Sequence, residues 1–168
     1  MNETALVVLV PEAEALVADH RLRHDPSAAA GVPAHVTVLY PFRSVIDDIA
    51  SDAVAEIAAS VPAFDVVFAT LGRFPGEVVY LVPEPAEPFR RLTAATAASF
   101  SDCPPYGGAI RDPVPHLTVA DGVDATTAAV LDSALRPGLP IATGVERLTL
   151  IAQDLTGHWI VVRHWPLG

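Results

Sequence analysis

The sequence predicts a single compact domain of strands and helices that is built as two similar halves. Three observations support this prediction. The chain of 168 residues is long enough for one domain with a real core, but too short for two large domains. Strand-like and helix-like segments follow one another as strand, helix, strand, helix, strand, first in residues of about 1–75 and again in 76–168, with one more strand at the end. A His-x-Thr triplet stands in the third element of each half, which indicates an internal duplication.

The first half begins with an apolar strand and continues into a helix that Pro11 starts. Proline suits the first turn of a helix, and the acidic residues after it suit the N-terminus. Apolar residues recur at helical spacing in the second helix, and Pro41 ends the strand before it. The predicted elements are strands at 4–10, 35–40 and 64–74, helices at 11–22 and 45–61, and a flexible loop at 25–33.

The second half repeats this order. Pro85 lies near the start of its first helix, and a loop rich in proline and glycine leads to the second His-x-Thr strand. The predicted elements are strands at 76–82, 116–120, 145–152 and 158–165, helices at 85–100 and 124–136, and a turn at DLTG.

Composition excludes several classes of protein. Hydrophobic residues make up 51% of the chain, but the apolar runs are short and none approaches the roughly 20 residues of a membrane-spanning helix. The N-terminus lacks the basic start of a signal peptide, so we expect a cytoplasmic protein without a membrane partner. Cys103 is the only cysteine, which excludes an internal disulfide and a cysteine-rich zinc site.

The charge balance argues against long nucleic acid as a partner. Ten arginines face twenty acidic residues, the net charge is -10, and lysine is absent, a composition that suits a high-GC bacterial source. A protein that grips long RNA usually presents a basic patch. Here the arginines are scattered, so we expect a small anionic substrate held by local groups, and we predict no protein partner.

The two His-x-Thr triplets are the candidate site. On a strand, residues two apart point to the same face, so His35 and Thr37 share one face in HVTVLYPF, as do His116 and Thr118 in PHLTVA. One such triplet means little, because a single strand histidine is usually a hydrogen-bonded structural residue. Two at the same point of a duplicated unit, each after a proline-containing loop, favour a shared catalytic function over two core histidines.

These residues resemble the two signature motifs of the two-histidine phosphoesterases. The segments RFPGEVVYLVP, CPPYGG, VPHLTVA and WIVVRHWPLG are similar in order and spacing to the 2'-5' RNA ligase-like branch of that superfamily, over almost the whole chain. The resemblance implies an α+β fold with two lobes related by a pseudo-two-fold axis. Two antiparallel-rich sheets would face a central cleft, with helices outside, and each would contribute one motif.

The chemistry explains why two copies are needed. Opening a cyclic phosphodiester requires a base that takes a proton from water and an acid that protonates the leaving oxygen. His35 and His116 can share these tasks, since imidazole titrates near neutral pH, and the hydroxyls of Thr37 and Thr118 can donate to phosphate oxygens. We expect neither a metal nor a cofactor; the histidine pair at 20 and 24 lacks a convincing third ligand.

The favoured function is hydrolysis of a 2',3'-cyclic phosphate or a similar small nucleotide phosphodiester. Arg43, Tyr106 and Arg111 are possible further substrate contacts, because they lie near the motif strands. Trp159 and Trp165 are an even number of residues apart, which predicts one shared packing face. Two alternatives stay open: a nucleotide-binding module without turnover, and 2'-5' RNA ligase activity.

Overall fold

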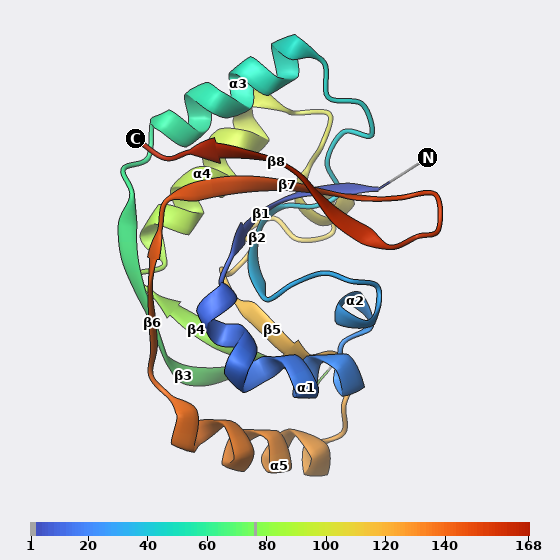
Figure 1. Cartoon of the computed structure of the whole chain (residues 1–168), viewed down its shortest axis with the longest axis vertical. Coiled ribbons are helices and arrows are strands. Elements are labelled where there is room, and N and C mark those ends of the chain that lie inside the picture. Colours follow the sequence, from blue (N-terminus) through green and yellow to red (C-terminus); the bar gives the residue numbers. More distant parts are fainter. Residues whose placement is uncertain (1–2, 76) are drawn as a thin grey trace.

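The structure of the protein is a computed structural model that describes residues 3–75 and 77–168. Its strands form two four-stranded antiparallel sheets (Figure 1). The strands are β1 (Thr4–Leu9), β2 (His35–Leu39), β3 (Phe64–Phe74), β4 (Val78–Glu84), β5 (Leu117–Ala120), β6 (Ile141–Val145), β7 (Arg147–Gln153) and β8 (Trp159–Pro166). The helices are α1 (Glu14–His24), α2 (Pro26–Ala29), α3 (Asp48–Ala59), α4 (Glu87–Ser99) and α5 (Ala125–Leu135). Short 3-10 turns span Pro11–Ala13, Pro105–Gly108 and Arg136–Gly138.

Each sheet combines strands from both halves of the sequence. One sheet has the order β2-β1-β7-β8 and the other the order β5-β4-β3-β6, with antiparallel pairing throughout. Strand β3 comes from the first half of the sequence but pairs with β4 of the second half. Strands β7 and β8 come from the second half and lie in the sheet that contains β1. The predicted α+β class with two antiparallel sheets is confirmed, but the two halves of the sequence are not the two sheets.

The helices lie outside the sheets. Two of them pack against a strand of the sheet that does not contain the strand before them. Helix α1 follows β1 but packs against β5 of the other sheet, and α4 follows β4 but packs against β2. Figure 1 shows α3 and α5 at opposite ends of the molecule with both sheets between them. Among the described helices, none combines the length and the apolarity that a membrane crossing needs.

Aspartates at the N-caps set where α3 and α5 begin. The Asp47 carboxylate accepts a hydrogen bond from the backbone N–H of Ala50 at 2.7 Å, so α3 begins at residue 48 and not at the predicted residue 45. Asp124 caps α5 in the same way through the N–H of Thr127, also at 2.7 Å. Both helices then bury an apolar stripe in the main core.

Some predicted elements differ from the structure. The sequence pattern missed β6, because the small residues and the glycine of IATGV weaken its apolar alternation. The loop at 25–33 contains the one-turn helix α2. The predicted strand 76–82 begins later, at Val78, and residue 76 lies outside the described residues.

The prediction that Trp159 and Trp165 share a face is wrong. A register shift in the β7–β8 pairing changes the alternation of β8 between these two residues. Trp165 is buried in the main core, whereas Trp159 packs edge-to-face on Tyr40, with ring centroids 6.3 Å apart, beside a second cluster. A bulge of this kind leaves no periodic signal in a single sequence.

Candidate active site

The fold brings the two motif strands together. Strands β2 and β5 are edge strands of different sheets, and they contact each other. His35 is the first residue of β2, and His116 immediately precedes β5. The two His-x-Thr triplets, half a chain apart in sequence, thus lie on neighbouring strands.

In both strands the apolar residues face the core and the polar motif residues do not. Val36 and Val38 are 0% and 2% exposed, and Leu117 and Val119 are both fully buried. The four motif side chains are half-buried: those of His35, Thr37, His116 and Thr118. The alternation predicted from the sequence is therefore present in the structure, and each motif presents its histidine and threonine on one face.

The two histidines make the same hydrogen bond. Nδ1 of His35 lies 2.7 Å from the carbonyl oxygen of Pro33, and Nδ1 of His116 lies 2.7 Å from that of Val114. A carbonyl oxygen can only accept, so Nδ1 carries the proton and donates in both rings. In a neutral ring Nε2 then bears the free lone pair. Each neutral imidazole can therefore accept a proton at Nε2, the ring nitrogen that is not bonded to the backbone.

Both imidazoles are neutral at pH 7 in this state. Burial lowers the pKa of His35 to about 4, and the positive charge of Arg21, together with that of His116 when it is protonated, acts in the same direction, against the Pro33 hydrogen bond and the Asp25 carboxylate. Burial also lowers the pKa of His116. An anionic phosphate placed between the rings would favour their charged form and so raise the pKa of the nearer imidazole.

Two aromatic rings pack against His116. The Phe74 ring meets the imidazole edge-to-face, with centroids 4.9 Å apart, and the Tyr80 ring lies at 5.4 Å. These two rings stack on each other at 4.1 Å. A Cβ on Gly72 would lie 2.3 Å from Cζ of Tyr80, so only glycine leaves room for this ring. Sequence reasoning missed all three residues; the one signal was the glycine within an otherwise regular strand pattern.

Tyr106 reaches the first motif from the loop that precedes the second. Its backbone N–H donates to the carbonyl of Tyr40 at 2.6 Å, which ties this loop to the end of β2. Burial raises the pKa of its hydroxyl, and a hydrogen bond with Thr37 acts the other way. The residue has a positive φ of 52°, a conformation uncommon for a non-glycine residue and frequent at functional sites.

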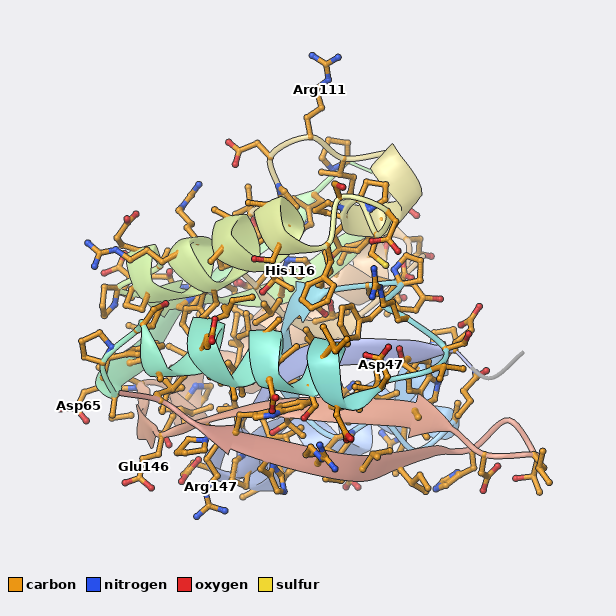
Figure 2. The ribbon with its side chains drawn as sticks, turned by 90° about the horizontal axis from the view of Figure 1, so that it is seen from above. Asp47, Asp65, Arg111, His116, Glu146 and Arg147 are labelled. Atoms are coloured by element: carbon orange, nitrogen blue, oxygen red, sulfur yellow. The ribbon has the colours of Figure 1, made fainter. Side chains whose placement is uncertain are left out.

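Within residues 3–75 and 77–168, no side-chain hydrogen bond joins Arg43 or Arg111 to a motif residue. The Arg43 guanidinium forms a two-pronged ion pair with Asp102, at 2.9 and 3.0 Å, and stacks on the Phe100 ring at 5.1 Å. Arg111 is exposed and points away from His116, as Figure 2 shows. A phosphate contact by either arginine stays a prediction.

Two cavities lie near the motifs but contain no motif side chain. One of about 320 Å³ is lined by Leu9, the cross-strand neighbour of His35, and by Thr149 and His164. The other, of about 370 Å³, is lined by residues around Asp25 and Asp121. The paired histidines, and not an enclosed cavity, therefore define the candidate site. Within residues 3–75 and 77–168, no three His, Cys, Asp or Glu side chains are grouped as metal ligands.

Comparisons with known proteins find one matching family model and solved structures of similar fold. The family model of the 2'-5' RNA ligase superfamily matches residues 9–157. Among solved structures, LigT of Escherichia coli in complex with NADP+ is 20% identical, with 99% of this chain and 97% of that chain covered and a TM-score of 0.62. The protein TT0787 of Thermus thermophilus is 19% identical, with 98% and 97% covered and a TM-score of 0.61. A comparison with curated proteins gives no match. At these identities the structural likeness shows the fold alone.

Proposed function

This chain belongs to the 2'-5' RNA ligase superfamily of two-histidine phosphoesterases, and we propose that it is a metal-independent phosphodiesterase that opens a 2',3'-cyclic phosphate or a similar small nucleotide phosphodiester. The observation that carries this proposal is the pair of equivalent histidines on β2 and β5, each with Nδ1 bonded to a backbone carbonyl at 2.7 Å. Two groups of equal chemistry on neighbouring strands suit a reaction that transfers one proton at each side of phosphorus.

In the proposed reaction, one imidazole takes a proton from water while the water oxygen forms a bond to phosphorus. The bond from phosphorus to one ribose oxygen breaks, and the second imidazole, as imidazolium, gives its proton to that oxygen. The product is a phosphomonoester with a free hydroxyl, and no oxidant or other reactant is consumed. The hydroxyls of Thr37 and Thr118 donate to the non-bridging oxygens and hold the phosphate between the rings.

The negative charge of the substrate favours the protonated imidazole that this reaction needs as its acid. Both rings are neutral when the site is free, but the acid must be protonated. A cyclic phosphodiester carries one negative charge, and its approach raises the pKa of the imidazole beside it. In the proposed reaction the hydroxyl of Tyr106, the partner of Thr37, adds a further donor to a phosphate oxygen.

A panel of 2',3'-cyclic nucleotides tests the proposal. The protein is incubated with each compound in excess chelator, and ³¹P NMR follows loss of the cyclic phosphate and identifies the phosphomonoester. We expect multiple turnovers in chelator, retained in the control His20→Ala, whose histidine lies on α1 and belongs to neither motif. Binding of the panel without turnover would instead indicate a nucleotide-binding module. Activity that disappears in chelator and returns with one added divalent metal would contradict the metal-independent mechanism.

A further inference from the structure

We propose that the buried ion pair between Arg21 and Asp25 is a positioning element for His35, which fixes the orientation and the tautomer of its imidazole. This role rests on the proposed function, because His35 is a proton-transfer group only in that reaction. Their influence on the imidazole passes through the backbone that precedes His35 and through their charges.

The pair is fully enclosed and fully bonded. Arg21 is 2% exposed and Asp25 is 5% exposed. The guanidinium donates to Asp25 Oδ2 from Nε at 3.2 Å and from Nη2 at 2.9 Å, and the other carboxylate oxygen accepts from the N–H and the hydroxyl of Ser27 at 2.9 and 2.7 Å. Removing one partner of such a pair would leave the other charge buried and uncompensated, so the pair locks this part of the chain.

The same hydrogen-bond network includes the residues immediately before His35. Nη1 of Arg21 donates to the carbonyl of Val32 at 3.1 Å. The next carbonyl, that of Pro33, accepts the His35 Nδ1 proton, and the N–H of Ala34 donates to the Glu14 carboxylate at 2.6 Å. Two side chains of α1 thus fix consecutive peptide groups immediately before the histidine. The Pro33 carbonyl cannot turn away from the ring without breaking these contacts.

Among the described residues, no buried ion pair supports the second histidine. Val114, whose carbonyl accepts from His116, is 42% exposed, and the residues of 107–112 are exposed. The ion pair in this part of the described chain, between Arg90 and Asp112, is long at 3.8 Å and open to solvent. The two histidines therefore make the same hydrogen bond in different surroundings. A buried ion pair supports the backbone before His35, whereas an exposed loop precedes His116.

The charges of the pair act on His35 in opposite directions. Arg21 on α1 and His116 before β5 lower the pKa of His35, whereas Asp25 in the following loop raises it. Removal of the Arg21 charge should therefore raise this pKa, and removal of the Asp25 charge should lower it. A role limited to stability would move neither value in a protein that remains folded.

The test is an NMR titration of the histidine side chains, which needs no enzymatic activity. Long-range ¹H–¹⁵N spectra of wild type, Arg21→Met, Arg21→Lys and Asp25→Asn report the pKa and the tautomer of each ring, with His35 assigned from its loss in His35→Gln. The control is Arg91→Met, which removes the arginine of the Glu87–Arg91 pair, a pair with the same spacing on a helix but 63% and 65% exposed.

In Arg21→Met we expect the His35 pKa to rise by on the order of 1 unit and the Nδ1–H tautomer to be mixed with the other. Arg21→Lys keeps the charge and should hold the pKa while losing the pure tautomer. Asp25→Asn should lower the pKa, and Arg91→Met and the His116 signal should not change. If the folded Lys and Asn variants both kept the wild-type pKa and tautomer at His35, the pair would be merely structural. Absence of turnover with these shifts present would instead reject the proposed function alone.

Discussion

At the scale of single residues, the two histidines are equal in their hydrogen bond and unequal in their surroundings. Both donate from Nδ1 to a carbonyl two residues earlier. His35 lies beside a buried arginine and carboxylate, whereas His116 lies against Phe74 and Tyr80. Burial lowers the pKa of both rings, so the free site holds two neutral bases and the substrate anion must supply the asymmetry.

These pKa shifts predict different pH optima for kcat/KM and kcat. In the free enzyme the pKa of His35 is about 4, and burial holds the pKa of His116 below its ordinary value, so a neutral and a protonated imidazole coexist at acidic pH. Since a lowered pKa means that the proton leaves at lower pH, kcat/KM should peak below pH 6.5 and fall toward neutrality. The bound phosphate raises the pKa of the acid, so kcat should peak at higher pH. Profiles from pH 4.5 to 9 with one cyclic nucleotide measure both; a kcat/KM that rises steadily to pH 8 would contradict this account.

The sequence could predict the motif residues but not the residues that support them. His35, Thr37, His116 and Thr118 stand out because a short polar pattern is repeated at equivalent points. Arg21 resembles a solvated helix charge in the sequence, but in the structure it is buried and bonded to Asp25 and Val32. Tyr80 meets His116 because β4 and β5 pair in one register, and a single sequence does not fix that register.

At the scale of elements, the site depends on two edge strands that face each other from different sheets. Each is backed by a helix from the other half of the chain, α4 behind β2 and α1 behind β5. The alternation of strand residues and the helical stripes were readable from the sequence, since each is a local period. Strand β6 and the bulge in the β7–β8 pairing have no local period, so the sequence does not predict them.

Strand β3 should influence catalysis through a glycine that touches no substrate. In Gly72→Ala the new Cβ meets the Tyr80 ring at 2.3 Å, so the ring must move, and His116 packs on that ring. A displacement of the imidazole on the order of 1 Å lowers kcat/KM by about 10- to 10²-fold. The matched control is Gly144→Ala on β6, whose Cβ has only an ordinary contact at 3.6 Å from Asp65. Equal activity of the two variants in steady-state assays would show that the position of Tyr80 does not matter.

At the scale of the whole molecule, the net charge opposes long polyanions. The charge is -10, and several arginines are already paired with carboxylates, including Arg21, Arg43, Arg91 and Arg136. The average field therefore repels RNA, while hydrogen bonds at the two motifs act on one phosphate at short range. This balance favours small substrates.

The charge predicts how activity depends on substrate length. Mononucleotide and dinucleotide cyclic phosphates should be hydrolysed at least as well as the same terminus on a long strand, and the preference should shrink as salt screens the repulsion. We would measure kcat/KM for cyclic-phosphate ends on strands from one to about 20 nucleotides at low and high salt. A steep rise with length at low salt that collapses at high salt would reveal a basic track and make long RNA the substrate.

The central claim is that His35 and His116 form one acid–base pair, and single alanine variants test it most directly. The measurement is kcat/KM for the best 2',3'-cyclic nucleotide with wild type, His35→Ala, His116→Ala and the control His20→Ala, with circular dichroism and thermal unfolding to establish the fold. Because each change removes one proton-transfer partner from a half-buried position, both motif variants should stay folded and lose about 10²- to 10⁴-fold in kcat/KM, with the control unchanged. Near wild-type activity in either folded motif variant would contradict the paired mechanism.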